Sequence, residues 1–256
     1  MSEAGLKLDL SSALERGQLF AHFQPQQDIA TGRIVSVEAL CRWRHPVLGL
    51  LSPSMFIPLA EESGVIHDIG IFMLEQSYSA AIDWQRNGMH LEISVNVSAT
   101  QLTTADFSDR VLRTVRQSPL PPRTLTVEIT ESVPILDLAL VVSRLKLLRE
   151  SGLGVSIDDF GTGHTSVSQL DDLPVTELKL DQSLVQSESD SVIAELARLL
   201  DYVHERDIRV VAEGVETFSD LDRVRHMGCD RAQGYLIGAP MARDDLESLL
   251  ARTGQP

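Results

Sequence analysis

Apolar and polar residues alternate along this chain in eight short runs that predict β-strands, and longer segments with helical periodicity separate them. The runs lie near residues 20–27, 34–43, 91–98, 124–130, 153–158, 176–181, 208–213 and 231–236. Helices are predicted over residues 53–62, 66–87, 136–150 and 191–206, with Ser52 as a helix N-cap and Gly88 as a helix end. Eight strands alternating with helices predict an α/β fold, a modified TIM (β/α)₈ barrel, that occupies residues 1–256 as one domain.

The first connection differs from the others because only residues 28–33 separate the first two strands. A parallel crossover needs about a dozen residues, so this connection must be a hairpin. The first strand is therefore expected to run antiparallel to the second. This geometry places Gln24, near the start of the first strand, at the same end of the barrel as the end of the second.

The second strand shows how side chains are distributed between the two faces of the barrel wall. Because strand side chains alternate, Glu38, Leu40 and Arg42 share one face, whereas Cys41 and Trp43 lie on the other. The same alternation turns further polar residues inward: Ser94, Asn96, Ser98, Thr126, Glu128, Thr130, Glu177, Lys179 and Asp181. Polar groups that point into a barrel are costly to bury unless they bind something.

Most of the predicted strands end in a carboxylate, carboxamide or amine side chain. These strand-end residues are Glu38, Asn96, Glu128, Asp158, Asp159, Lys179, Asp181, Glu213 and Gln233. The carboxyl ends of barrel strands form the catalytic face of TIM-barrel enzymes, and a surplus of oxygen ligands there indicates a divalent cation such as Mg²⁺. The alternative is a buried layer of ion pairs. Six carboxylates facing essentially one lysine do not balance as ion pairs, whereas a cation balances them.

Composition narrows the class of partner. The formal net charge of −15 opposes binding to long nucleic acid, which requires basic surfaces, but it leaves small phosphate ligands possible. No apolar run is long enough to cross a bilayer, and the amino-terminal residues lack the pattern of a signal peptide, so a cytoplasmic location is expected. Cys41 and Cys229 match no zinc-binding spacing and are expected to be buried, reduced thiols.

The strand-end residues also belong to an ordered series of motifs. In chain order they are Phe23-Gln-Pro25, Glu38-Ala-Leu40 followed by Arg42-Trp43, Asn96-Val-Ser98, Glu128-Ile-Thr-Glu131, Asp158-Asp-Phe-Gly-Thr-Gly163, Leu178-Lys-Leu-Asp181, Ala212-Glu-Gly-Val-Glu216 and Gln233-Gly-Tyr235. From about residue 14 to residue 240 the chain resembles the EAL domain family, the cyclic di-GMP-specific phosphodiesterases. The resemblance implies a modified TIM barrel with an antiparallel first strand. It also implies hydrolysis of cyclic di-GMP to linear pGpG with Mg²⁺ or Mn²⁺, which lowers the level of a second messenger.

The resemblance further implies a site with two metal ions. Glu38, Asn96, Glu128 and Asp158 would hold one ion, and Asp158 with Asp159 would reach a second. Two such ions about 3.5–4 Å apart can activate water, neutralise the phosphate and stabilise the leaving oxygen.

Catalytic and substrate contacts follow from the same resemblance. Lys179 is expected to touch the attacking water or the phosphate, and Glu213 is expected to act as general base or as both base and metal ligand. Substrate contacts are assigned to Gln24, Leu40, Arg42 and Gln233, with the planar guanidinium of Arg42 suited to a phosphate. Glu131 is expected to anchor the loop after Asp159, and Asp181 and Glu216 are expected to support that loop or the ligands.

Some residues depart from the family pattern, and other functions compete with catalysis. His164, Thr165, Gln182 and Ala239 replace commoner residues, which affects expectations for loop packing and partner surfaces more than the central chemistry. One alternative is a catalytically silent cyclic di-GMP receptor or protein-docking module, but each metal and catalytic position is retained. Another is a phosphodiesterase that also accepts pGpG or another cyclic dinucleotide. The resemblance implies a homodimer.

Overall fold

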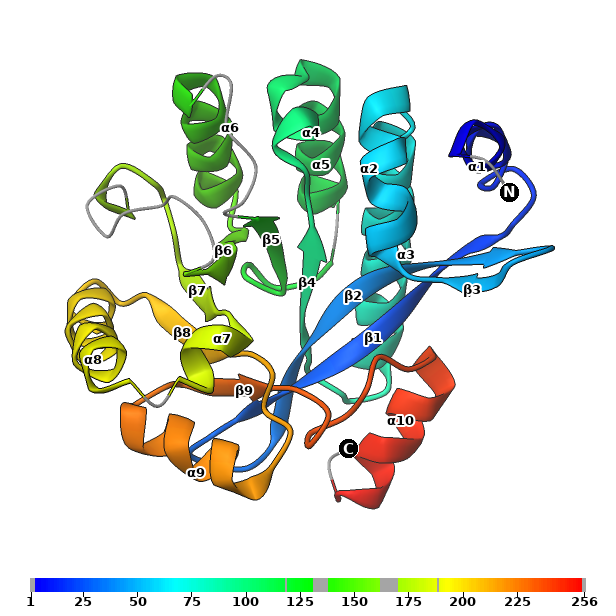
Figure 1. Ribbon diagram of the computed structural model, residues 1–256. Helices are drawn as coiled ribbons and strands as arrows, with labels where there is room; N and C mark the ends of the chain where they lie inside the picture. Colours follow the sequence, from blue (N-terminus) through cyan, green and yellow to red (C-terminus); the bar gives the residue numbers. More distant parts are fainter. Residues whose placement is uncertain (1–2, 118, 131–137, 162–169, 188, 255–256) are drawn as a thin grey trace.

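The computed structural model describes residues 3–117, 119–130, 138–161, 170–187 and 189–254 (Figure 1). The strands are β1 (Leu19–Asp28), β2 (Ile34–His45), β3 (Gly49–Leu51), β4 (Glu92–Asn96), β5 (Leu125–Thr130), β6 (Gly154–Phe160), β7 (Glu177–Leu180), β8 (Arg209–Ala212) and β9 (Arg231–Gln233). The helices are α1 (Glu3–Ser11), α2 (Pro53–Ser63), α3 (Ile66–Arg86), α4 (Ala99–Thr103), α5 (Ala105–Gln117), α6 (Leu138–Glu150), α7 (Gln182–Val185), α8 (Asp190–His204), α9 (Phe218–Met227) and α10 (Arg243–Arg252).

The strands form one sheet that closes on itself. Their order is β1-β9-β8-β7-β6-β5-β4-β2-β3, and an additional pairing of β1 with β2 completes the barrel. β1 runs antiparallel to both β2 and β9, whereas the neighbours from β2 through β4 to β9 are parallel. The predicted barrel with an antiparallel first strand is therefore confirmed.

The β1–β2 turn has the geometry that its length requires. The Asp28 backbone N–H donates to the Arg33 carbonyl, and the Asp28 carboxylate accepts hydrogen bonds from the backbone and side chain of Thr31. Gly32 adopts a left-handed φ of 70°, which glycine reaches without steric cost. The resulting register sets Gln24 directly opposite Glu38, as the hairpin prediction requires.

Two strand predictions differ from the structure. β3 was not anticipated; it is a three-residue strand folded back on β2, in which only Leu51 is buried, so it carries too little pattern to detect. The last strand ends at Gln233 rather than near residue 236. The chain turns there, with the N–H groups of Ile237 and Gly238 donating to the Gly234 carbonyl.

The outer faces of the strands pack against the helices that surround the barrel in Figure 1. On β2, Cys41 and Trp43 are buried on the face that packs toward the helices, and both cysteines of the chain are buried free thiols, as expected. The predicted helices are present with ends shifted by one to two residues, except that residues 136–137 lie outside the described residues. Ser52 is the N-cap of α2, although its hydroxyl bonds the Ser54 hydroxyl rather than a backbone N–H.

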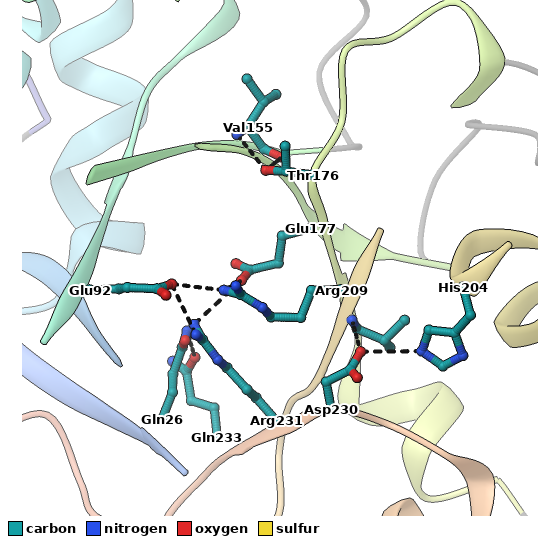
Figure 2. Close-up of polar contacts among 11 residues, drawn as sticks. Gln26, Glu92, Val155, Thr176, Glu177, His204, Arg209, Asp230, Arg231 and Gln233 are labelled. Carbon is teal, nitrogen blue, oxygen red and sulfur yellow. Dashed lines mark hydrogen bonds and ion pairs between the residues drawn. The ribbon is translucent and has the colours of Figure 1, made fainter. Parts of the chain in front are cut away.

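The amino ends of the strands hold a partly buried ion network, the barrel floor, which consists of Glu92, Glu177, Arg209 and Arg231 (Figure 2). Arg209 lies 2.7 Å from Glu92 and 3.1 Å from Glu177, and Arg231 lies 2.9 Å and 3.7 Å from the same two carboxylates. Two acids and two bases neutralise one another here. The carboxylates that are not matched by an equal number of basic side chains lie instead at the carboxyl ends of the strands, at the other mouth of the barrel.

No helix within the described residues is both long enough and apolar enough to traverse a lipid bilayer.

Candidate active site

The strand-end residues converge because neighbouring strands pair in register. Asn96 on β4 is opposite Glu128 on β5, and Asp158 on β6 is opposite Thr130 at the end of β5. Lys179 projects from β7, and Glu213 directly follows β8. Parallel strands thus bring residues far apart in the sequence to one mouth of the barrel.

Lys179 lies at the centre of this group. Its ammonium nitrogen is 2.7 Å from Asp158 Oδ1 and 2.8 Å from Glu213 Oε1, and its side chain is only 1% exposed. Glu38 Oε2 and Glu128 Oε2 lie farther away, at 3.3 and 3.4 Å. Four carboxylates therefore share one cation, so the cluster carries an excess of buried negative charge.

The protonation equilibria reflect this excess. Burial lowers the pKa of Lys179, but the surrounding carboxylates outweigh burial and raise it well above its ordinary value. Burial together with Glu38 and Asp158 raises the pKa of Glu128 well above normal, against the opposing attraction of Lys179. Burial raises the pKa of Glu213 to about 8, with Asp158 adding to the shift, and burial and Asp158 raise the pKa of Asp159 to about 6.

Glu38 behaves differently from its neighbours. Burial alone would raise its pKa, but Lys179 and the side-chain amides of Gln233 and Asn96 stabilise the carboxylate and hold the pKa below its usual value. The Gln233 amide donates to Oε2 at 2.6 Å, and the Asn96 amide donates to Oε1 at 2.6 Å. Glu38 is therefore the carboxylate that is held ionised.

Two groups of carboxylates have the spacing of cation ligands. Within the described residues, Glu38, Glu128 and Asp158 each offer an oxygen within 4.8 Å of the others, and Asp158, Asp159 and Glu213 do the same. Oε1 of Glu128 is buried without a hydrogen bond of proper geometry to any described residue, although the Ser94 hydroxyl lies close by. Hard oxygen ligands and an unpartnered buried oxygen fit divalent cations such as Mg²⁺ or Mn²⁺.

The two carboxylate groups contain the acidic residues that the family resemblance assigns to the ions, and Glu213, expected as base or as base and ligand, lies in the second group. The two groups share Asp158, the residue expected to reach both ions. Asp159 has a left-handed φ of 56°, a conformation that a non-glycine residue seldom adopts, which aims its side chain differently from the regular strand alternation. Sequence periodicity therefore does not determine the direction of Asp159.

A chain of glutamines borders the cluster. The Gln233 amide also donates to Gln24 Oε1 at 3.2 Å, and the Gln26 amide donates to Gln233 Oε1 at 2.8 Å. Gln26 is fully buried and was not among the predicted site residues. Its strand parity with Gln24 was the signal that could have identified it. The glutamines orient Gln233 toward Glu38 and limit its freedom to turn.

A cleft of about 440 Å³ opens beside the cluster. Glu38, Leu40, Asn96 and Asp158 are among its lining residues, and α2 and α3 form its opposite side. Glu61 of α2 accepts a hydrogen bond from the Ser98 hydroxyl at the start of α4, and this contact was not predicted. The cleft gives a ligand access to the carboxylates from the helix side.

Arg42 lies two residues beyond Leu40 on the same face of β2. Its guanidinium is half-buried and donates to the Cys41 carbonyl at 2.9 Å. Burial lowers its pKa, while Glu38 and Tyr235 are among the nearby groups that raise it. Arg42 is thus an available cationic donor at the rim of the site.

The remaining predicted residues lie around the cluster. Asp181 caps α7, where its carboxylate accepts from the Ser183 backbone N–H at 2.8 Å, and its charge contributes to the raised pKa of Asp159. Glu216 is exposed, and its backbone N–H donates to Asp220 at the start of α9. Glu131 lies outside the described residues, as do His164 and Thr165.

Two departures from the family pattern have definite positions. Gln182 opens α7 and packs beneath Gly214, the residue after Glu213. Ala239 is exposed beyond β9. Gln182, but not Ala239, is therefore in contact with the segment that carries a candidate catalytic residue.

Comparisons with known proteins give a consistent result. The family model for the EAL domain matches residues 7–240. The cyclic di-GMP phosphodiesterase PA2567 of Pseudomonas aeruginosa is 39% identical over 239 residues, which cover 90% of this chain and 40% of that protein. The bifunctional diguanylate cyclase/cyclic di-GMP phosphodiesterase MucR of the same organism is 38% identical over 253 residues, covering 95% and 36%.

A solved structure of the PaMucR phosphodiesterase in complex with c-di-GMP matches with a TM-score of 0.87 and 37% identity, covering 94% of this chain and 99% of that chain. The chain spans less than half the length of the two curated relatives.

Proposed function

This chain belongs to the EAL domain family, and we propose that it is a metal-dependent phosphodiesterase that hydrolyses cyclic di-GMP to linear pGpG. The observation that carries the proposal is the buried cluster in which two carboxylate groups share Asp158 beside an open cleft. The relatives named as cyclic di-GMP phosphodiesterases and the c-di-GMP complex of PaMucR support the choice of substrate.

The residues divide into ligands and groups that handle the substrate. Glu38, Asn96, Glu128 and Asp158 would hold one cation, and Asp158 with Asp159 would hold a second; both Mg²⁺ and Mn²⁺ suit these oxygen donors. The cations would supply Lewis-acid activation of water and would neutralise charge on the phosphate. The amide of Asn96 can contribute an oxygen without adding another negative charge.

We assign the role of general base to Glu213. Its pKa of about 8 places its titration near neutral pH in the metal-free protein, and a general base works best when its pKa lies near the operating pH. Lys179, 2.8 Å from Glu213, remains an ammonium and can hold either the attacking water or a phosphate oxygen. Glu38 fixes the inner ligand group because two amides and Lys179 already hold it ionised.

Side chains at the rim of the site would orient the substrate. Arg42 presents a planar guanidinium suited to a phosphate, and Leu40 offers an apolar contact at the cleft. Gln24 and Gln233 offer amide groups next to Glu38. We further propose that the chain is one EAL domain over residues 1–256, that it acts in the cytoplasm, and that it works as a homodimer.

Turnover of cyclic di-GMP with Mg²⁺, Mn²⁺ or EDTA, with products separated by chromatography, tests the proposal. We expect pGpG only with a divalent cation, and we expect Glu38→Ala to abolish it. Glu75→Ala, which removes an exposed glutamate of α3, is the matched control and should retain turnover. Cation-independent turnover or full activity of Glu38→Ala would refute the metal assignment.

The second candidate function is a cyclic di-GMP receptor without catalysis. It is favoured by the Lys179 ammonium, which already lies among the carboxylates and provides charge compensation without a metal ion. Tight binding of cyclic di-GMP without product, under every cation tested, would establish this function in place of the enzyme. Parallel reactions with pGpG and other cyclic dinucleotides would define the range of substrates.

A further inference from the structure

A second polar cavity lies at the opposite mouth of the barrel. Its volume is about 600 Å³, and it is lined by the first residues of β6, β7 and β8 and by the ends of α6 and α8. Cavities of this size accommodate small molecules. Glu92, Glu177 and Arg209 of the floor network line this cavity at the amino ends of their strands (Figure 2), whereas the carboxylate cluster lies at the carboxyl ends. The cavity is therefore separate from the proposed active site.

Most charged groups in the cavity wall already have partners. Glu92 and Glu177 are neutralised within the barrel floor. Asp230 accepts a hydrogen bond from the Val210 backbone N–H at 2.7 Å and lies 3.2 Å from His204 Nε2 (Figure 2). Arg206 pairs with Asp171 at 3.2 Å outside the cavity. These groups are occupied by the protein itself.

Arg123 and Arg149 are different. In the described part of the chain, neither guanidinium forms an ion pair with a carboxylate. The pKa of Arg149 lies below its ordinary value, first because the group is partly buried and then because the charge of Arg123 repels it. Asp207 is the remaining carboxylate of the wall and also forms no ion pair among the described residues, so the two neighbouring guanidiniums exceed it by one positive charge in a chain whose formal net charge is −15.

The backbone holds this arginine pair in place. The Arg123 N–H donates to the Gly152 carbonyl at 2.6 Å, and the Gly152 N–H donates to the Arg149 carbonyl at 3.0 Å. Gly152 has a φ of 96° and packs so closely on Pro122 that a Cβ there would lie 3.0 Å from the proline ring. Arg123 itself has a φ of 67°, a strained left-handed conformation. The segments bearing the two arginines are therefore joined and positioned before any ligand arrives.

Gly154 and the floor complete the cavity wall. Gly154 begins β6, and a Cβ there would lie 2.4 Å from Thr126 Oγ1, so the close packing of β6 on Thr126 of β5 favours glycine. Arg209 forms the inner wall, where Glu92 and Glu177 hold it. A ligand would thus meet, at the rim, two guanidiniums that form no ion pair with the described residues, and a fixed polar wall inside.

We propose that this cavity binds a small phosphate-bearing anion, with Arg123 and Arg149 as the residues that recognise the phosphate group. Guanidiniums bind phosphate oxygens through paired N–H donors, and such charge-assisted bonds are among the strongest in proteins. Free phosphate and a nucleoside monophosphate share the recognised group, and the volume of the cavity leaves room for the larger ligand. The site serves a ligand other than the one bound at the carboxylate cluster.

Titration of the ¹⁵N-labelled full chain in EDTA, followed by NMR of backbone amides and arginine Nε–Hε groups, tests this proposal. The probes are inorganic phosphate, guanosine 5′-monophosphate and guanosine without phosphate. We expect saturable shifts of Arg123, Arg149 and Gly152 with both phosphate-bearing probes and none with guanosine. In the double variant Arg123→Gln/Arg149→Gln, the affinity of both probes should fall at least about tenfold.

Arg252→Gln is the control, because Arg252 lies in the last turn of a helix like Arg149 and is exposed like Arg123, and the affinity of this variant should equal that of the parent. Shifts that sodium chloride reproduces at equal ionic strength would overturn the proposal. Equal binding of guanosine and its monophosphate would overturn it too, as would undiminished affinity in the double variant. Because the readout needs neither metal nor turnover, it stands independently of the proposed enzyme activity.

Discussion

Lys179 is the residue on which the electrostatic balance of the cluster depends. Its replacement by methionine, Lys179→Met, keeps an unbranched side chain of similar length and removes the positive charge. Four carboxylates, from Glu38, Glu128, Asp158 and Glu213, then lose the cation that lies 2.7 to 3.4 Å from each. We expect the metal-free variant to be much less stable than the parent.

The expected loss follows from the burial of the pair partners. Lys179 is 1% exposed, and the partner carboxylates are 0 to 17% exposed, so water screens these charges poorly. Removing one partner of a buried ion pair costs about 3–5 kcal/mol. For a domain of this size each kcal/mol corresponds to about 2–4 °C, so the melting temperature should fall by roughly 6–20 °C. The loss should be smaller in acid, where the carboxylates take up protons instead.

Thermal unfolding followed by circular dichroism at pH 8, first in EDTA and then with Mn²⁺, measures this effect. Mn²⁺ should raise the melting temperature of the variant more than that of the parent, because the ion no longer competes with an ammonium group for the carboxylates. Lys146→Met, which removes an exposed lysine of α6, is the control and should change little. A Lys179→Met protein as stable as the parent in EDTA at pH 8 would refute the view that the buried, ionised carboxylate of Glu38 depends on the Lys179 ammonium.

Three further predictions concern pH, the backbone and the floor. In EDTA burial raises the pKa of Glu213 from its ordinary value of 4.5 to about 8, so between these values the folded state retains a proton that the unfolded state has lost. Stability should therefore fall as pH rises through this window, by at most about 1.4 kcal/mol per pH unit, and urea unfolding of Glu213→Gln should lack that contribution. Gly214→Ala should destabilise more than Gly88→Ala, since both glycines have positive φ but only at Gly214 would the new Cβ lie 2.3 Å from Gln182; equal losses in denaturant midpoint would contradict the clash. Glu177→Gln should destabilise the fold, because Arg209 and Arg231 would then share Glu92 alone, but by less than the about 3–5 kcal/mol of a fully buried pair, since Arg209 and Glu92 are one-third exposed; an unchanged midpoint in chemical unfolding would contradict a stabilising role of the floor.

The sequence alone determined the architecture, because its signals are local and periodic. Six residues between the first two strands cannot make a parallel crossover, so the antiparallel β1 followed from chain length alone. Strand parity put Glu38, Leu40 and Arg42 on one face, and the ordered motifs identified the family. The strand-end carboxylates were expected at one mouth because the carboxyl ends of barrel strands form one face.

Tertiary structure decided how those groups meet, because distances across a closed barrel depend on the register of every strand. Only the closed sheet shows that Lys179 touches four carboxylates and that Gln26 supports Gln233. The left-handed backbone at Asp159 and the capping role of Asp181 break the strand alternation locally, and periodicity does not report such breaks. The pKa of Glu213 likewise depends on burial and neighbours that are remote in sequence. The absence of an ion pair at Arg123 and Arg149 among the described residues also depends on the fold. Pattern in the chain specifies which face a side chain occupies, but only the folded barrel specifies which charges share that face and at what distance.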